Sequence, residues 1–88
     1  MDLSLKGKVA VVGGSSEGIG YAIARLLAAE GAQVVTVARR KENLVSSSER
    51  ISSETKAEVH PVAADIRKAG DCERIIASAV ERFGRLDI

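Results

Sequence analysis

Glycines cluster at one point of this 88-residue chain: four of its eight glycines lie within the eight residues from Gly13 to Gly20. The run Gly14-Ser15-Ser16-Glu17-Gly18-Ile19-Gly20 follows the apolar stretch 9–12 and precedes a segment with helical periodicity. Unpaired N–H groups and the positive end of the dipole make a helix N-terminus a site for phosphate. A β-carbon at the closest points would block the anion, so glycine is needed there. The spacing therefore predicts a pyrophosphate-binding loop.

This loop differs from two commoner phosphate motifs. The G-x-x-x-x-G-K-[ST] loop requires a Lys after its second glycine, where this chain has Ile19-Gly20. The G-x-G-x-x-G fingerprint of dinucleotide-binding domains is also absent, since the spacing here is G-x-x-x-G-x-G. An alternative stays open at this point: the glycines could serve only to make a tight turn between a strand and a helix.

Three cations, Arg39-Arg40-Lys41, follow a second apolar run and begin nineteen residues after Gly20. An acidic residue at about this distance binds the ribose 2′-OH of NAD, whereas an Arg accommodates the 2′-phosphate of NADP. The cations also precede a predicted helix, whose dipole disfavours positive charge unless an anion lies among them. We therefore expect NADP(H) to be favoured over NAD(H), with Arg39 as the main ligand of the 2′-phosphate and Arg40 as its helper. A solvated basic turn is the alternative.

The hydrophobic pattern predicts strands that alternate with helices. Short runs of apolar, largely β-branched residues predict strands, and repeats at i, i+3 and i+4 predict helices. The expected strands are 9–12, 34–38 and 59–64, and the first and last helices carry the apolar stripes Ile19, Ala22, Ile23, Leu26, Leu27 and Cys72, Ile75, Ile76, Ala79, Val80, Phe83. Gly31 and Gly84 are placed to end these two helices. The segment 42–55 has few large apolar residues and many serines, so we expect a poorly formed surface helix that frays toward its end.

This order predicts an α/β fold, namely the first βαβαβα half of a Rossmann-type, doubly wound parallel sheet. Pro61 cannot donate a hydrogen bond to a neighbouring strand, so the third strand is expected at a sheet edge. The predicted strand order is 3-2-1, with residues 86–88 as the start of strand 4 beside the first strand.

Composition and charge exclude several classes of function. The chain is 45% hydrophobic, and its length suits one domain. Its net charge of +1 argues against a polyanion such as nucleic acid as a partner. A single Cys leaves no disulfide framework or metal-ligand quartet and suits a reducing compartment. The start, with Asp2, does not fit a signal peptide, and the apolar stretch 19–29 is too short to span a membrane, so we expect a soluble cytoplasmic protein.

The stretch from Lys6 to Arg40 resembles the start of a short-chain dehydrogenase/reductase, a family whose members carry T-G-x-x-x-G-x-G at this place. The resemblance continues at Ala64-Asp65-Ile66 and over 83–88, and it extends to NADP-dependent members similar to 3-oxoacyl-carrier-protein reductase. The resemblance implies cofactor contacts by Gly14, Ser16, Glu17, Gly18, Ile19, Gly20, Arg39, Arg40, Asp65 and Ile66.

Four positions add detail to what the resemblance implies. Asp65 and Ile66 match the family's adenine-pocket pair, in which the carboxylate accepts from the adenine amine; taken alone, Asp65 could also cap the helix that follows. Gly13 replaces the family's usual Thr, whose hydroxyl braces the loop, so a less rigid loop is expected. Glu17 argues against NADP, because many NADP-preferring members carry a basic residue there and a carboxylate would repel the phosphate.

The catalytic pattern of the family is not found in these 88 residues. Members use a Tyr and a Lys in a Y-x-x-x-K pattern, with a Ser, for hydride transfer between the nicotinamide and a carbonyl or alcohol. The only Tyr, Tyr21, precedes Arg25 at that spacing, but Arg cannot replace the Lys, so we expect Tyr21 to be a packing or surface residue. Cys72 is expected in the core and His60 in solvent. We predict that this chain alone holds no catalytic residue and no metal site and is inactive.

Two hypotheses follow from these features. In the first, residues 1–88 are the NADP(H)-binding N-terminal part of a single Rossmann domain, truncated before the catalytic half of an oxidoreductase that acts on a small-molecule carbonyl or alcohol. In the second, they form a complete, non-catalytic module that binds a dinucleotide or a partner. The first is favoured because a complete domain rarely stops on the first residues of a strand beside the sheet centre. A homo-oligomer is expected only for the full-length enzyme.

Overall fold

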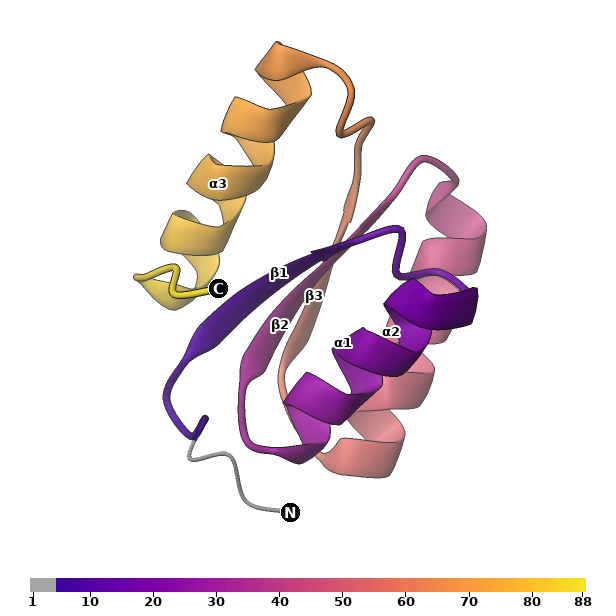
Figure 1. The fold of residues 1–88 in the computed structure, drawn as a ribbon, viewed down its shortest axis with the longest axis vertical. Coiled ribbons are helices and arrows are strands. Elements are labelled where there is room, and N and C mark those ends of the chain that lie inside the picture. Colours follow the sequence, from indigo (N-terminus) through magenta and orange to yellow (C-terminus); the bar gives the residue numbers. More distant parts are fainter. Residues whose placement is uncertain (1–4) are drawn as a thin grey trace.

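The computed structural model describes residues 5–88, and the prediction that the start of the chain is no signal peptide falls partly on Met1–Ser4, outside these residues. Three strands alternate with three helices along the chain, as predicted (Figure 1). The elements are β1 (Val9–Gly13), α1 (Gly18–Ala29), β2 (Gln33–Ala38), α2 (Lys41–Thr55), β3 (Val59–Ala63) and α3 (Ala69–Phe83). Gly84 follows α3 directly and Gly31 follows the C-cap residue of α1, Glu30, and both glycines have positive φ, +83° and +103°, so their predicted role at the helix ends is confirmed.

The strands form one parallel sheet in the order β1-β2-β3, which confirms the predicted order 3-2-1. Within the described residues, β3 pairs with β2 alone, and Pro61 lies opposite Thr36 on that side. The third strand is therefore an edge strand here, as the proline predicted.

The last three residues run beside β1. The N–H groups of Asp87 and Ile88 donate to the carbonyl of Val9, and the N–H of Val11 donates to the carbonyl of Ile88 at 2.9 Å. The segment 86–88 thus pairs with β1 as the start of a fourth strand would, although it is too short to form a regular strand.

Helices cover both faces of the sheet, with α1 and α2 on one face and α3 on the other (Figure 1). Each face has its own buried cluster because successive side chains of a strand point to opposite sides. The cluster beneath α1 and α2 contains Val12, Ala24, Ala28, Ala32, Val34 and Ile51, and the cluster beneath α3 contains Val35, Val37, Val62, Ala64, Ile75 and Ala79. This three-layer arrangement is the predicted half of a doubly wound fold.

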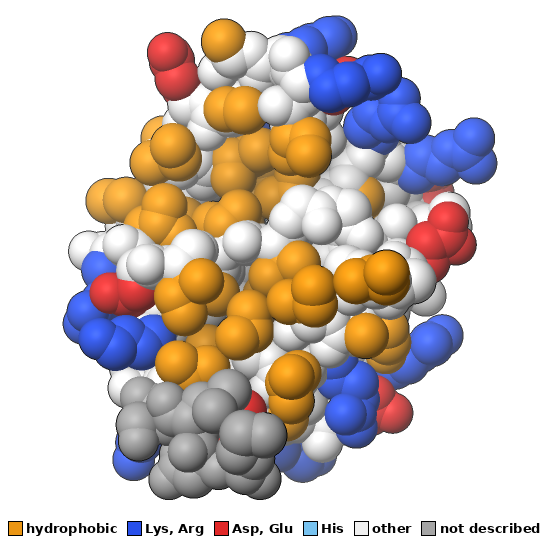
Figure 2. All heavy atoms as spheres, viewed as in Figure 1, with side chains coloured by type: hydrophobic (Ala, Val, Ile, Leu, Met, Phe, Trp, Pro, Cys, Tyr) orange, Lys and Arg blue, Asp and Glu red, His pale blue; other side chains and the backbone are white. Residues whose placement is uncertain are grey.

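The apolar stripe predicted on α1 is largely exposed, and of its large residues Leu27 alone packs against the cluster beneath α1 and α2. The side chains of Ala24 and Ala28 are buried against the sheet, whereas Ile19 is 80% exposed and Ile23 and Leu26 are about half exposed. The small side chains allow the helix to lie close to the strands, and the larger apolar residues consequently face outward. Figure 2 shows hydrophobic side chains gathered over the face of the molecule on which α1 and α3 flank β1.

The prediction of a frayed second helix is also wrong. Helix α2 is continuous over fifteen residues, and it buries Ser48 together with Leu44 and Ile51. The hydroxyl of Ser48 forms a hydrogen bond of 2.6 Å with the hydroxyl of Thr36 in β2, which removes the usual cost of burying a serine. Low helix propensity is therefore offset by specific tertiary partners.

Candidate cofactor-binding site

The glycine loop connects the carboxyl end of β1 to the first turn of α1, and three of its glycines are required by the backbone. Gly14 and Gly18 both have φ of +66°, a conformation that side chains rarely adopt. A β-carbon on Gly20 would overlap the carbonyl of Gly14. Gly13 differs, because a β-carbon there would only contact Ile66 at an ordinary 3.5 Å. The geometry accounts for a tight strand-to-helix turn, and phosphate binding by the loop stays a prediction.

Ser15 braces the loop, a role that sequence reasoning missed. Its side chain is fully buried, and its hydroxyl donates to the carbonyl of Val12 at 2.8 Å and accepts from the N–H of Val37 at 2.9 Å. The N–H of Ser15 also donates to the carbonyl of Val37. The loop thus has a hydroxyl brace between the ends of β1 and β2, although Gly13 provides none. A small polar residue between glycines was the signal available in the sequence.

A polar groove of about 340 Å³ separates the loop from α2 and is lined by Ser16, Glu17, Asn43, Ser46, Ser47 and Arg50. The hydroxyl of Ser47 donates to the carbonyl of Ser16 at 2.5 Å and ties α2 to the loop. Glu17 is exposed at the start of α1, where a negative charge is stabilised by the helix dipole. Two of the predicted contacts, Ser16 and Glu17, therefore lie in this groove.

A second cavity, of about 270 Å³, lies at the carboxyl ends of all three strands and is lined by Gly14, Val37, Ala38, Arg39, Ala64, Asp65, Ile66 and Arg67. This end of a parallel α/β sheet is where such folds bind ligands. The cavity unites four predicted site residues, namely Gly14, Arg39, Asp65 and Ile66. Arg40 precedes α2 as an exposed residue and does not line the cavity. Gly18, Ile19 and Gly20 form the first turn of α1.

A larger cavity, of about 600 Å³, lies at the opposite, amino end of the strands, near Gly31 and Lys56. It contains none of the predicted site residues. Size alone therefore does not select the candidate site in this chain.

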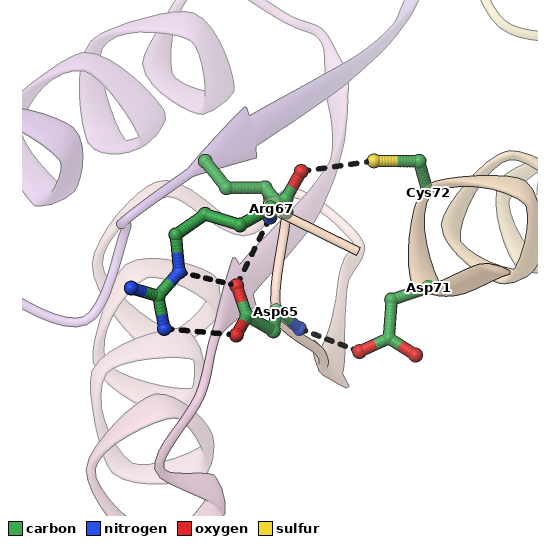
Figure 3. Close-up of polar contacts among 5 residues, drawn as sticks. Asp65, Arg67, Asp71 and Cys72 are labelled. Carbon is green, nitrogen blue, oxygen red and sulfur yellow. Dashed lines mark hydrogen bonds and ion pairs between the residues drawn. The ribbon is translucent and has the colours of Figure 1, made fainter. Parts of the chain in front are cut away.

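Asp65 and Arg67 form the strongest polar contact at the second cavity (Figure 3). The guanidinium of Arg67 pairs with both carboxylate oxygens of Asp65, each at 3.0 Å, and the N–H of Arg67 donates to Oδ1 at 3.0 Å. These hydrogen bonds lower the pKa of Asp65 from 3.8 to about 2, so its carboxylate is ionised at neutral pH.

The alternative role of Asp65 as a helix cap is wrong. Helix α3 begins at Ala69, and its N-cap residue, Lys68, forms no capping hydrogen bond through its side chain. The Asp65 carboxylate instead bonds within its own turn to Arg67, and the N–H of Asp65 donates to Asp71 Oδ2 at 2.8 Å. Asp71, in the first turn of α3, thus ties the helix to the end of β3, another contact that sequence reasoning missed.

The predictions for Cys72 and His60 are both wrong. Cys72 is half-buried rather than in the core, and its thiol donates to the carbonyl of Ile66 at 3.1 Å (Figure 3). His60 is half-buried rather than solvated, because α3 packs over β3 and brings Ser78 within 3.0 Å of His60 Nε2. The His60 ring also contacts Phe83 edge-on, with 6.5 Å between ring centroids.

Tyr21 packs against the cluster beneath α1 and α2, and the guanidinium of Arg50 lies 5.7 Å from the centroid of its ring. This confirms its prediction as a packing residue. Within residues 5–88, no group of three His, Cys, Asp or Glu side chains lies close enough together to hold a metal ion. No helix in the same range is long and apolar enough to cross a membrane.

Comparisons with known proteins identify the family. The family model described as short chain dehydrogenase matches residues 8–88. The chain is 40% identical over 88 residues to 1,6-dihydroxycyclohexa-2,4-diene-1-carboxylate dehydrogenase of Pseudomonas putida. The match covers all of this chain and 32% of that protein.

Solved structures of the same family share the fold. The L-sorbose reductase of Gluconobacter frateurii, complexed with NADPH and L-sorbose, superposes with a TM-score of 0.94 and 38% identity over 99% of this chain and 33% of that one. A metagenomic short-chain oxidoreductase in complex with NADP has a TM-score of 0.87 and 38% identity, over 97% of this chain and 38% of that one. The chain thus spans about a third of the length of the relatives that it matches. It belongs to the short-chain dehydrogenase family, as the resemblance at the glycine loop implied.

Proposed function

We propose that residues 1–88 are the NADP(H)-binding N-terminal part of a single Rossmann domain in a short-chain dehydrogenase, and that the whole enzyme transfers hydride between NADP(H) and a small-molecule carbonyl or alcohol. The observation that carries this proposal is the cavity at the carboxyl ends of the strands, where Gly14 of the loop lies near Arg39 and Asp65. Two similar proteins whose structures are known were solved with NADPH or NADP bound, which supports the choice of cofactor.

Each part of the proposed site has a separate task. The N–H groups at the start of α1 bind the pyrophosphate, because they have no partner inside the helix. Arg39, at the end of β2, binds the 2′-phosphate, and Arg40 assists from the residue before α2. Asp65 and Ile66 hold the adenine at the end of β3. When bound, the nicotinamide of the cofactor would donate or accept the hydride.

Glu17 weakens binding of the 2′-phosphate, because its negatively charged carboxylate lies beside the loop and repels an anion. The proposal holds despite Glu17, since two exposed guanidinium groups, Arg39 and Arg40, follow β2 and no carboxylate stands there. The net preference is for NADP(H) over NAD(H).

These 88 residues supply cofactor binding and not the chemical step. Tyr21, the only Tyr, is engaged in packing on α1 and is followed by Arg25 rather than a Lys at the required spacing. The catalytic groups, the residues that select the substrate and any homo-oligomeric interface are therefore assigned to the full-length enzyme. We place that enzyme in the cytoplasm, since the one Cys within these 88 residues suits a reducing compartment.

A titration of the 88-residue chain with NADPH and with NADH tests the choice of cofactor. The variant Arg39→Ala should weaken NADPH binding by about tenfold or more, because it removes a charged hydrogen bond to the 2′-phosphate, and should leave NADH binding nearly unchanged. The matched control is Lys8→Ala, which removes an exposed cation at the amino end of the sheet. Equal losses for both cofactors would refute the role of Arg39, and a wild-type chain that binds neither would refute the proposed function.

A further inference from the structure

Arg67 is a residue of the candidate cavity to which neither the sequence motifs nor the proposed function assigns a role. Its side chain is 71% exposed, whereas the side chain of its partner Asp65 is only 15% exposed. Both residues belong to the turn between β3 and α3, and both line the cavity that Arg39 and Gly14 also line. The exposed member of the pair thus covers the carboxylate that the proposed function places against adenine.

The hydrogen bonds of Asp65 leave little acceptor capacity. An ionised carboxylate has about four acceptor positions, two on each oxygen. Oδ1 accepts from the N–H and from Nε of Arg67, and Oδ2 accepts from Nη2 of Arg67. Within the described residues, one acceptor position on Oδ2 therefore remains for a ligand.

The hydrogen bonds to Arg67 also fix the direction in which the remaining acceptor position on Asp65 Oδ2 points. A two-point pair between a guanidinium and a carboxylate holds both groups in one plane, so the Asp65 side chain cannot rotate freely. The backbone of Asp65 is held from the other side, because its N–H donates to Asp71 (Figure 3). The low pKa of Asp65 keeps the carboxylate ionised, which makes it a pure acceptor.

We propose that Arg67 is a positioning residue that turns Asp65 into a fixed, single acceptor for the exocyclic amino group of the bound purine. The cavity then selects adenine over a purine that carries a carbonyl oxygen at position 6, because that oxygen would face a carboxylate. This inference rests on the proposed function, since it concerns the purine of the same dinucleotide.

The test measures purine selectivity rather than affinity alone. NADPH and its hypoxanthine analogue, reduced nicotinamide hypoxanthine dinucleotide phosphate, differ at the purine and share the nicotinamide and phosphates. Fluorescence titration of the 88-residue chain should give about tenfold tighter binding, or more, for NADPH. In Arg67→Ala this ratio should fall to about twofold, because the Asp65 carboxylate is free to rotate away.

Two further variants separate geometry from charge. Arg67→Lys keeps the positive charge but cannot bond both oxygens in one plane, so its ratio should lie between those of the wild type and Arg67→Ala. Lys68→Ala removes the adjacent exposed cation, which does not line the cavity, and should keep the wild-type ratio. Circular dichroism establishes that each variant is folded.

The possible failures are distinguishable. A wild-type chain that binds NADPH while Arg67→Ala weakens both dinucleotides by the same factor would overturn the inference and leave the proposed function standing. Equal affinity of the wild-type chain for the two dinucleotides would also overturn the inference and leave the proposed function standing. A wild-type chain that binds neither dinucleotide would overturn both the inference and the proposed function. An Arg67→Lys variant that keeps the full wild-type ratio would show that positive charge alone suffices, and would overturn the positioning role of Arg67.

Discussion

Gly20 lies directly against the backbone of Gly14, so that a β-carbon at position 20 would overlap the Gly14 carbonyl oxygen. This contact joins the first turn of α1 to the start of the loop, across the turn that carries the predicted phosphate site. The close approach of the two backbones, rather than a special φ at position 20, is what requires glycine there.

The variant Gly20→Ala should therefore both destabilise the chain and abolish NADPH binding. The added methyl group must displace backbone, because no flexible side chain is present to yield, and a cost of about 1–3 kcal/mol in the free energy of unfolding is expected. Urea unfolding followed by circular dichroism measures it. Gly70→Ala is the control, since Gly70 lies in α3 with nothing near its absent β-carbon, and it should be neutral or slightly stabilising. Similar effects of the two substitutions would contradict this account.

Ser15→Ala should destabilise the chain by about 1–3 kcal/mol, because it leaves the N–H of Val37 buried without its hydroxyl acceptor. The loss should appear as a lower urea midpoint with an unchanged slope. Ser53→Ala, at an exposed position of α2, supplies the comparison and should be nearly silent. If both substitutions were silent, Ser15 would not brace the loop.

The buried hydroxyl pair between Thr36 and Ser48 should be energetically coupled. Thr36→Val or Ser48→Ala alone leaves one buried hydroxyl without its partner, at a cost of about 1–3 kcal/mol each. The double variant removes both groups, so it should cost less than the sum of the two by about 1 kcal/mol. A double-mutant cycle of unfolding free energies measures the coupling, and strict additivity would show that the two hydroxyls act independently.

Stability should fall on acidification below about pH 4, in part through Asp65. The folded-state pKa of Asp65 is lowered from 3.8 to about 2 by its hydrogen bonds to Arg67, so its contribution is present above 3.8 and is lost as pH falls toward 2. The pKa of Asp87 is lowered in the same direction by Arg85, and its contribution is lost on the same side.

Asp65→Asn removes one of these contributions. Urea midpoints measured between pH 5 and about pH 2 should fall less steeply for this variant than for the wild type. The control is Glu73→Gln, an exposed carboxylate of α3 outside this network, which should keep the wild-type slope. An unchanged slope in Asp65→Asn would mean that the ion pair with Arg67 contributes nothing to stability.

The exposed apolar side chains of α1 and α3 should make the 88-residue chain self-associate. Ile23 in α1 and Ile76 in α3 are each about half exposed. Figure 2 shows hydrophobic side chains gathered over the face of the molecule on which these two helices flank β1. The double variant Ile23→Lys with Ile76→Lys should shift sedimentation toward the monomer. Glu73→Lys changes the net charge by the same +2 without altering the apolar area, and it should sediment like the wild type. A wild-type chain that is monomeric at all concentrations would refute this prediction.

Local chemistry determined much of the fold from sequence alone. The strand order was predictable from the alternation of strands and helices, and the edge position of β3 from Pro61, which lacks an N–H. The ends of α1 and α3 were predictable because glycine readily adopts positive φ. The glycine loop was predictable for a related reason: Gly14 and Gly18 adopt backbone conformations that other residues rarely take. These features depend on the conformational properties of single residues and their immediate neighbours, so they can be predicted from the sequence.

Tertiary packing decided which face of α1 is buried and whether α2 is stable, neither of which the hydrophobic periodicity could show. A repeat of apolar residues on α1 shows that a face is hydrophobic, but Ala24 and Ala28 are buried because only small side chains let the helix lie close to the sheet. The stability of α2 was hidden for a similar reason, since the partner of Ser48 is Thr36, twelve residues earlier on another element.

The residues of the candidate site likewise fall into those that the sequence predicted and those that only the tertiary structure revealed. Arg39 was found from its spacing after a strand and Asp65 from the resemblance to the family, and both line one cavity because the carboxyl ends of parallel strands meet at one edge of the sheet. Ser15 and Arg67 were missed, because their importance lies in which oxygen or N–H group they meet in space. The sequence pattern placed Arg39 and Asp65 at the site, and the folded backbone decided which further residues reach it and which atoms they contact, since a hydrogen bond depends on a few tenths of an ångström that no pattern of residue types encodes.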